Sequence, residues 1–358
     1  MDNTNRSVRD RLRSGMIIPA HPLALTDAGA LDEVSQRALT RYYIDSGAGG
    51  IAVGVHTTQF EIRDHGLLEP VLALAAETAR DWTMMPHTPV PTVETPSMPL
   101  LIAGACGETA QAVQEAALAR DLGYDAVLLS PGGLAAHDDA YLLERAAAVG
   151  EVLPLIGFYL QPAVGGRVLS RSWWRRFFEI ESVVGVKAAP FNRYYTQDVA
   201  FALAESGRAE EVALYTGNDD HIVMDYLTTF ACPIGRETVH VSVAGGLLGH
   251  YACWTSPSKT VFERAKAHDG TVAELMQLAE QVTDMNAALF DVAHDFAGCI
   301  AGIQWVLKTY GIIRSDRCLN EHERLSTGQE AALRQVMHAY SHLCDETLIL
   351  SERDRWRR

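Results

Sequence analysis

Hydrophobic and polar positions form two alternating patterns along the chain. Short runs of β-branched and apolar residues recur about every 30 residues, separated by segments rich in Ala, Leu, Glu and Arg with helical periodicity. The predicted strands are Met16–Ala20, Gly50–Val55, Pro99–Ala103, Ala126–Ser130, Pro154–Tyr159, Val183–Lys187, Val212–Thr216 and Val239–Val243. The predicted helices between them include Asp32–Ser46, Thr109–Leu122, Asp139–Val149 and Asp198–Glu205, several of which open on an Asp or Thr that can cap a helix. The pattern predicts a repeated strand and helix unit.

The number of units indicates the fold class. About eight units within roughly 230 residues match the size of a (β/α)8 barrel. A doubly wound open sheet shows the same alternation, but no Gly-x-Gly-x-x-Gly run follows the first strand, and the candidate functional residues close several different strands. We therefore predict an α/β fold, a (β/α)8 TIM barrel with a C-terminal helical extension. The predicted domains are a polar N-terminal segment at 1–14, a catalytic barrel at 15–268 and the helical extension at 269–358.

Three segments lie outside the regular repeat. Residues Asp81 to Met98 contain four prolines and are predicted to form an irregular loop. Thr271–Tyr310 and Gln329–Leu350 have helical patterns and form the predicted extension. The terminal Glu352–Arg358 is rich in charge and is predicted to be a frayed, solvated tail.

Composition narrows the class of partner. The 358 residues include 30 Lys and Arg against 45 Asp and Glu, a formal net charge of -15, which disfavours nucleic acid or an anionic membrane as a partner. The six cysteines form no Cys-x-x-Cys pair, so neither a zinc site nor a disulfide framework is indicated. No apolar leader or membrane-spanning run is evident. We expect a cytoplasmic protein.

The predicted sixth strand ends in a lysine, Lys187, and the predicted fifth ends in a tyrosine, Tyr159. A charged amine is costly to bury, so a lysine at the mouth of a buried parallel sheet points to amine chemistry, such as a Schiff base with a carbonyl substrate. The residues alone leave open the alternative that Lys187 simply extends its amine to solvent from a strand end.

Seven short motifs follow one another between about Gly15 and about Lys266. They are Gly15-Met16-Ile17-Ile18-Pro19-Ala20, Gly29-Ala30-Leu31-Asp32, Thr57-Thr58, Tyr159-Leu160-Gln161-Pro162, Gly185-Val186-Lys187, Gly217-Asn218-Asp219-Asp220 and Gly245-Gly246. Each motif is weak alone, but their order and spacing resemble the dihydrodipicolinate synthase / N-acetylneuraminate lyase superfamily of class I pyruvate-dependent aldolases.

The resemblance implies roles for four residues. Lys187 attacks the ketone of a 2-oxo acid, and the protonated imine then acts as an electron sink at the adjacent carbon. Tyr159 moves protons to and from the carbinolamine; the alternative is a packed ring without a catalytic role. Thr57 and Thr58 bind the substrate carboxylate, with Thr58 the favoured residue; the alternative is that both cap the following turn.

Departures from the family pattern limit the assignment. His56 precedes the threonine pair and Gln59-Phe60 follows it, where the family has glycine before and Gly-Glu after. The stretch that corresponds to the family's substrate-binding arginine reads Ala163-Val164-Gly165, and Arg167 lies further on. The loop after the fourth strand, Ser130 to Leu134, lacks the tyrosine that the family commonly places there. The last two departures argue against a role in lysine biosynthesis.

The resulting hypothesis is a Schiff-base lyase, aldolase or hydro-lyase that acts on a 2-oxo acid such as pyruvate and on an unidentified carbonyl partner. The imine with Lys187 requires no separate cofactor and no metal. The candidate substrate-binding residues are Thr57, Thr58, His56, Gln161 and Gly245, and Phe60, Asn192 and Arg193 also flank predicted strand ends. The resemblance also implies a homo-oligomer, a dimer or tetramer.

Two other classes of function stay open. A metal-dependent barrel hydrolase calls for a His-x-His motif after the first strand, where Ala20-His21-Pro22 supplies one histidine. A catalytically silent barrel that binds a 2-oxo acid without turnover is compatible with the missing tyrosine.

Overall fold

The computed structural model describes residues 2–85 and 97–358. It has the predicted fold, a (β/α)8 barrel followed by a helical extension, with the strand order β1-β9-β7-β6-β5-β4-β3-β2 and an additional strand, β8, paired with β9. The chain divides into two compact units, one comprising residues 1–16 and 102–247 and the other residues 17–101 and 248–358. The three domain boundaries drawn from the sequence stay a prediction.

The strands lie within a few residues of their predicted positions. Their bounds are Ile17–Pro19 (β1), Gly50–Val53 (β2), Leu100–Ala105 (β3), Ala126–Leu129 (β4), Leu155–Leu160 (β5), Val183–Ala189 (β6), Ala213–Thr216 (β7), Thr229–Ile234 (β8) and Glu237–Leu248 (β9). The strands β1 to β7 are buried along their length except at one residue, Lys187. Continuous burial is expected of parallel strands covered on both faces, so the polar exception marks a position of interest.

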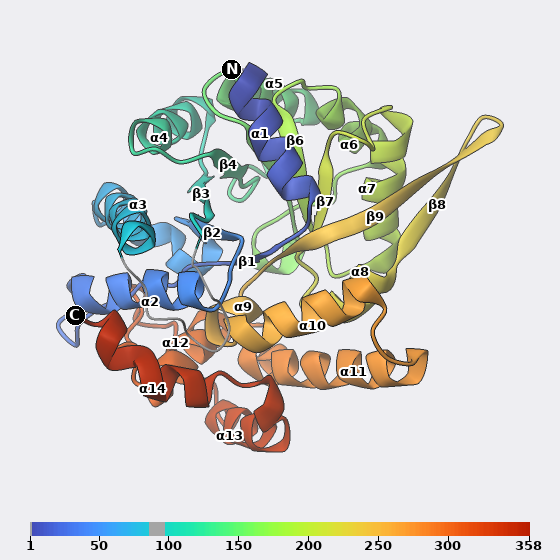
Figure 1. Ribbon diagram of the computed structural model, residues 1–358. Coiled ribbons are helices and arrows are strands. Elements are labelled where there is room, and N and C mark those ends of the chain that lie inside the picture. The colour runs from blue at the N-terminus through green and yellow to red at the C-terminus, as the bar shows by residue number, and fades with distance from the viewer. Residues whose placement is uncertain (1, 86–96) are drawn as a thin grey trace. The chain divides into compact units, whose positions relative to one another are not determined.

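The first unit contains six parallel strands, β3 to β7 and β9, and the helices between them. The helices are Asp2–Arg13 (α1), Thr109–Asp121 (α4), Asp139–Gly150 (α5), Arg171–Phe178 (α6), Arg193–Glu205 (α7) and Ile222–Leu227 (α8), with a short 3-10 helix at Pro162–Val164 (η3). Helices α4 to α7 lie on the outer side of the strands, as Figure 1 shows. The segment predicted as polar forms α1, whose Leu12 is buried and accepts a hydrogen bond from the Tyr215 hydroxyl at 2.8 Å.

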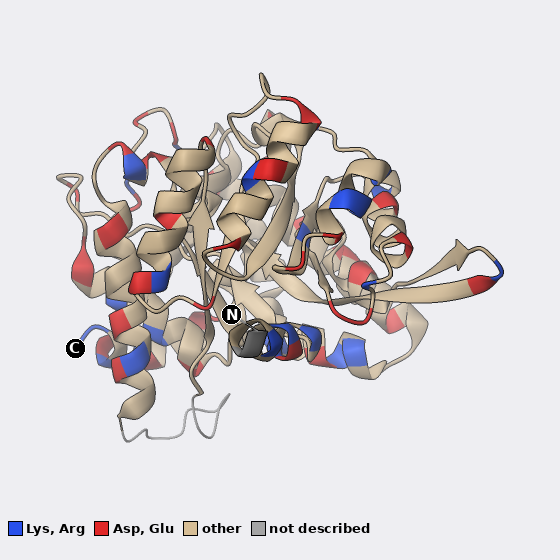
Figure 2. Ribbon diagram, turned by 90° about the horizontal axis from the view of Figure 1, so that it is seen from above, with Lys and Arg blue, Asp and Glu red and all other residues tan. Residues whose placement is uncertain are grey.

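Strands β8 and β9 form a long antiparallel hairpin that the sequence pattern did not predict. Phe230 and Cys232 of β8 are buried and β8 packs beside α7, while the alternate residues of β8 face solvent. The hairpin extends beyond α7 in Figure 1, and its tip carries the charges of Arg236 and Glu237 in Figure 2. The two sides of the hairpin therefore differ in polarity, as expected of a two-stranded ribbon packed on one face.

The second unit contains the remaining strands and the helical extension. Its helices are Glu33–Asp45 (α2), Leu68–Met84 (α3), His250–Cys253 (α9), Thr255–Ala267 (α10), Val272–Leu289 (α11), Cys299–Tyr310 (α12), Gln329–Ala339 (α13) and Glu346–Trp356 (α14), with 3-10 helices at His56–Thr58 (η1), Phe60–Arg63 (η2), Val292–His294 (η4) and Ser341–Leu343 (η5). Helix α3 continues through Met84, and the rest of the predicted irregular loop, at 86–96, lies outside the described residues. None of the described helices combines the length and apolarity needed to cross a bilayer.

The prediction of a solvated C-terminal tail is wrong, because α14 is anchored on α2. Trp356 is fully buried and donates its indole N–H to the Asp45 carboxylate at 2.7 Å. Trp82 and Arg355 donate to the same carboxylate at 2.9 and 2.5 Å. The sequence pattern hid this contact because one buried indole among charged residues has no periodicity to reveal it.

We expect Trp356→Ala to destabilise the protein by ~3–5 kcal/mol, because it removes a buried ring and leaves part of the Asp45 carboxylate unpaired. Urea denaturation followed by circular dichroism measures the loss. Arg358→Ala, at an exposed position two residues further, is the control and should change stability by less than ~0.5 kcal/mol. Equal denaturation midpoints for Trp356→Ala and the wild type would contradict the anchor.

Candidate functional site

Lys187 lies on β6 among apolar neighbours of the first unit. Its Cα pairs with Phe158 on β5 and with Tyr215 on β7, and its side chain is half-buried. The ammonium nitrogen lies 4.4 Å from the centroid of the Phe158 ring. Residues paired across parallel strands share a face of the sheet, so Lys187, Phe158 and Tyr215 point to the same side.

The shared face is the inner one. A Cβ built on Gly185, two residues before Lys187, would lie 3.5 Å from Leu12 of α1 and not against an outer helix. On β5, by contrast, a Cβ on Gly157 would lie 2.6 Å from Phe177 of α6, which places Gly157 on the outer face. Because side chains alternate along a strand, Phe158 faces inward with Lys187, and Gly157 and Tyr159 face outward.

Tyr159 packs against the outer helices. Its ring centroid lies 5.2 Å from that of Trp174 on α6 and 6.1 Å from that of Tyr195 on α7. Its hydroxyl accepts from the backbone N–H of Leu169 at 3.3 Å and donates to the carbonyl of Leu169 at 3.5 Å. Burial raises the pKa of Tyr159 to about 12. The catalytic role of Tyr159 stays a prediction, and its place in the register gives that role no support.

Gly217, directly after β7, makes room for the lysine side chain. A Cβ at this position would lie 2.5 Å from Cε and 3.0 Å from Cγ of Lys187, and 2.8 Å from Cβ of Ala189. The backbone N–H of Gly217 donates to the carbonyl of Ala188 at 2.7 Å, which continues the β6–β7 pairing past the end of the strand. The aliphatic stem of Lys187 therefore passes directly over the Gly217 backbone, where any other residue would displace it.

Asp219, in the loop after β7, is a residue to which the sequence analysis assigned no role. It follows Gly217 by two positions and is half-buried. Burial raises the pKa of the Asp219 carboxyl to about 7, the charge of Lys187 lowers it and that of Asp220 raises it further. The pair of consecutive acids in the Gly217 to Asp220 motif was the available signal, but only the structure distinguishes the half-buried carboxyl from the exposed one of Asp220.

A buried polar network holds the loop that carries Asp219. The Asn218 side chain accepts from the N–H of Phe191 at 3.1 Å and donates to Thr196 at 3.2 Å and to the Asp225 carboxylate at 3.0 Å. The fully buried Asp225 also accepts from Thr216 at 2.6 Å and from Arg193 at 2.5 Å. The network joins the loops after β6 and β7, the two strand ends that carry Lys187 and Asp219.

Four other candidates lie in the first unit. Asn192 caps α7 by accepting from the N–H groups of Tyr194 and Tyr195, and Arg193 is held by Asp225. Gln161 is buried directly after β5. A Cβ on Gly245 would lie 2.1 Å from the carbonyl oxygen of Met16, so the close approach of two backbones requires this glycine. The substrate-binding roles of Gln161 and Gly245 stay predictions.

The candidate residues of the second unit lie in η1, after β2. The Thr58 hydroxyl accepts from the N–H groups of Gly54 and Val55 at 2.9 and 3.2 Å and donates to the carbonyl of His21 at 2.6 Å. The Thr58 hydroxyl therefore stabilises the loop that contains it. Among the described residues, the Thr57 side chain makes no hydrogen bond to the backbone comparable with those of Thr58. The half-buried His56 lies 5.9 Å from Phe60, ring centroid to ring centroid.

His21, the histidine considered as a metal ligand, is turned toward α2. Its Nε2 lies 2.9 Å from the Thr40 hydroxyl, and its Nδ1 lies 2.8 Å from the carbonyl of Pro22. Burial lowers the pKa of His21 to about 4, so the ring is neutral and both nitrogens are engaged. Across residues 2–85 and 97–358, no group of three or more His, Cys, Asp or Glu has an arrangement that could hold a metal ion.

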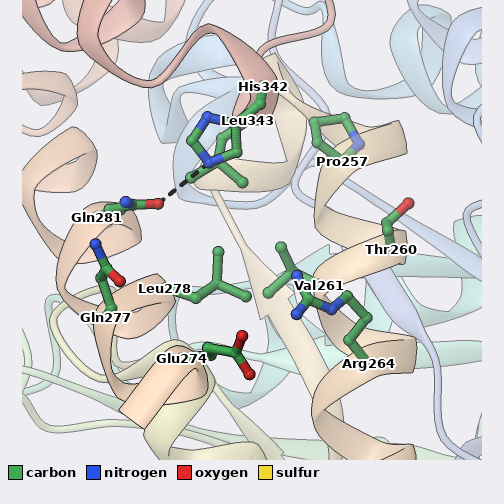
Figure 3. A pocket seen from close by; sticks show the side chains of 10 residues that line it. All are labelled: Pro257, Thr260, Val261, Arg264, Glu274, Gln277, Leu278, Gln281, His342 and Leu343. Atoms are coloured by element: carbon green, nitrogen blue, oxygen red, sulfur yellow. Dashed lines mark hydrogen bonds between the residues drawn. The ribbon is translucent and has the colours of Figure 1, made fainter. Parts of the chain in front are cut away.

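The second unit also contains a polar cavity of about 340 Å³ between α10 and α11. Figure 3 shows Arg264 and Glu274 at one end and His342, which lies 3.2 Å from the Gln281 amide oxygen, at the other. No predicted site residue lines this cavity.

Lys187 differs from every other lysine in the chain. The sequence contains only three more, Lys259, Lys266 and Lys308, and all of them lie on helices of the second unit. Lys259 pairs with Glu263 at 2.6 Å and Lys308 with Asp316 at 2.9 Å. A strand-borne, half-buried lysine beside an aromatic ring and a carboxyl is the arrangement that permits amine nucleophilic chemistry.

The model of the dihydrodipicolinate synthetase family matches residues 13–340. No curated protein matches. Dihydrodipicolinate synthase from Bacteroides thetaiotaomicron is 19% identical with a TM-score of 0.72, and covers 91% of this chain and 98% of its own.

Two further solved structures share the fold. N-acetylneuraminate lyase from Fusobacterium nucleatum is 18% identical, with a TM-score of 0.70 and coverage of 92% of this chain and 99% of its own. Dihydrodipicolinate synthase from Oceanobacillus iheyensis is 14% identical, with a TM-score of 0.75 and coverage of 94% and 99%.

We expect Gly217→Ala to reduce borohydride trapping of a 2-oxo acid on Lys187 by ~10²-fold, because the new methyl group displaces the amine from its position. Gly185→Ala, on the same strand as Lys187, is the control, since its added Cβ makes only ordinary contacts at 3.4 Å and beyond. Equal trapping by the two variants, at unchanged circular dichroism, would contradict the steric role of Gly217.

Proposed function

The chain belongs to the dihydrodipicolinate synthetase family, and from this membership we propose that it is a lyase that forms an imine between Lys187 and a 2-oxo acid such as pyruvate. The family and the structural neighbours are class I aldolases and lyases. The reaction is an aldol cleavage or condensation with a carbonyl partner, or the elimination of water. The covalent imine supplies the electron sink, so the proposed mechanism uses no cofactor.

The environment of Lys187 is the observation that carries this proposal. An amine attacks a carbonyl only in its neutral form, and an apolar surrounding favours that form because it disfavours the charged one. The Phe158 ring lies 4.4 Å from the nitrogen, and the alkyl stem crosses Gly217. These contacts hold the half-buried lysine side chain at the inner face of the sheet.

The substrate carboxylate is bound by the threonine pair in this proposal, as the resemblance implies. Local geometry shifts the preference from Thr58 to Thr57, because the Thr58 hydroxyl already has three partners, the N–H groups of Gly54 and Val55 and the carbonyl of His21. His56, Gln161 and Gly245 remain proposed contacts for the substrates.

Lysine biosynthesis is not the proposed pathway. Arg167 donates to the carbonyl of His137 at 2.7 Å and pairs with Asp139 at 2.9 Å, so it holds the loop after β4. The arginine that the resemblance associates with the second substrate of that pathway therefore has no counterpart in Ala163-Val164-Gly165. The carbonyl partner of this enzyme is a different molecule.

A catalytically silent 2-oxo-acid-binding protein is the second candidate. One observation favours it: the ring that faces Lys187 is Phe158, which has no hydroxyl to exchange protons. A metal-dependent hydrolase has less support, since both nitrogens of His21 have partners in its own unit. We further propose a cytoplasmic location, from the cysteine pattern of the sequence, and a homo-oligomer, a dimer or tetramer, from the resemblance.

Mass spectrometry after borohydride reduction with pyruvate tests the imine directly. The expected result is one stable adduct on Lys187, lost in Lys187→Ala and retained in the control Lys259→Ala. Because the chain has four lysines, peptide mapping assigns the adduct without ambiguity. An adduct elsewhere, or none with any 2-oxo acid of a panel, would sink the proposal. Product formation from the same panel separates an enzyme from a binder.

We expect substitution of Thr58 to reduce stability and substitution of Thr57 to weaken substrate binding. Thr58→Val should destabilise the protein by ~1–3 kcal/mol, because it leaves the carbonyl of His21 and the N–H of Gly54 without their partner. Thr57→Val should leave stability unchanged and raise the KM for the 2-oxo acid about 10-fold or more, the loss of one hydrogen bond to a charged group. Thermal denaturation and steady-state kinetics measure the two effects, and an unchanged KM in Thr57→Val would refute its role.

A further inference from the structure

We propose that Asp219 is the general acid and base that exchanges protons with the imine at Lys187. This inference rests on the proposed function, since it presupposes that Lys187 condenses with a 2-oxo acid. It assigns the proton transfer to the loop after β7 rather than to the tyrosine of β5.

Lys187 and Tyr159 lie on opposite faces of the sheet. Phe158 pairs with Lys187 and faces it, and Phe158 has no acidic proton. The Tyr159 side chain is on the other face, where its hydroxyl is bonded to Leu169. A phenol with a pKa of about 12 also gives up its proton reluctantly at neutral pH.

Asp219 lies on the loop that the lysine crosses. Lys187 pairs with Tyr215 at the end of β7, and its stem contacts the backbone at Gly217, two residues on. Asp219 follows Gly217 by two residues and is half-buried, and the charge of Lys187 lowers the pKa of its carboxyl. The site of imine formation and the carboxyl therefore belong to adjacent strand ends of the same unit.

The loop is fixed before any substrate arrives. Asn218, between Gly217 and Asp219, makes three side-chain hydrogen bonds, to Phe191, Thr196 and Asp225. Groups held by buried hydrogen bonds keep their geometry through a reaction, as proton transfer requires. The carboxylate of Asp225 is occupied by Arg193, Thr216 and Asn218, so it is not available for the same task.

The protonation state of Asp219 fits both directions of transfer. Burial holds its pKa at about 7, against the charge of Lys187, so acid and carboxylate coexist at neutral pH. The charged groups that act on it are Lys187 of β6 and Asp220 of its own loop. Asp220 is the exposed neighbour of Asp219, and its charge raises the pKa of the Asp219 carboxyl.

The proton steps balance as follows. The lone pair of the neutral Lys187 amine forms the C–N bond as the carbonyl π pair moves to oxygen, and one proton passes from nitrogen to oxygen through the Asp219 carboxyl group. Protonated Asp219 then gives its proton to the hydroxyl, which leaves as water while the nitrogen lone pair forms the C=N bond. The Asp219 carboxylate finally takes a proton from the carbon next to the imine, which yields the neutral enamine and regenerates the acid.

Exchange of the pyruvate methyl protons in D2O, followed by NMR, isolates the last of these steps and needs no knowledge of the carbonyl partner. We expect Asp219→Asn to slow this exchange by ~10²-fold or more, and to remove the inflection near pH 7 that the wild type shows in its pH–rate profile. Asp220→Asn is the matched control, because it removes the same charge from the next position. It should exchange at close to the wild-type rate and keep the inflection, at a lower pH because the charge of Asp220 raises the pKa of Asp219. Tyr159→Phe should also exchange at close to the wild-type rate.

Borohydride trapping of the same variants separates the two ways in which the account can fail. If Asp219→Asn still forms the reduced adduct but exchanges slowly and without the inflection, the assignment holds. If it exchanges at the wild-type rate, or if Tyr159→Phe loses exchange instead, the assignment is overturned while the imine stands. If the wild type forms no adduct, the proposed function fails and the role of Asp219 fails with it.

Discussion

The placement of one amine on an apolar inner face is the constraint on which the site depends. Lys187 is the only half-buried residue in strands that are otherwise buried along their length, and its nitrogen lies over the Phe158 ring. A charged amine in such a place is costly unless a carboxyl or a reaction offsets the cost. Gly217 supplies the space for the stem, and Asp219 supplies the opposite charge.

The residues around the site support the position of Lys187 indirectly, by fixing the loops that surround it. The buried network around Asp225 fixes the loops after β6 and β7 to each other, so the strand ends that carry Lys187 and Asp219 are held together without a ligand. Pre-organisation of this kind lowers the cost of proton transfer, because little has to move during the reaction. Arg193, which the sequence suggested as a substrate-binding residue, is part of the same network, because its guanidinium is held by Asp225.

The fold could be read from the sequence to a large extent, and the site only in part. Parallel strands buried on both faces give short apolar runs, so eight of the nine strands within the described residues were predicted, and Lys187 stood out as the polar end of one run. The β8–β9 hairpin was not predicted, because Pro233 and Gly235 interrupt its alternation of apolar and polar residues. Tyr159 shows why its role was harder to predict than its strand. A shift of one residue in a strand moves a side chain to the other face, and a four-residue motif cannot fix the register to that accuracy. Thr58 and Asp219 depended on hydrogen bonds and burial that no spacing encodes.

A crystal structure of the enzyme after borohydride reduction with pyruvate tests the central claim most directly. The account predicts continuous density from Nζ of Lys187 into the reduced adduct, with the Asp219 carboxyl within hydrogen-bonding distance of the former imine and the Tyr159 hydroxyl still bonded to Leu169. An unmodified Lys187, or an adduct approached by the hydroxyl of Tyr159 and not by Asp219, would contradict it.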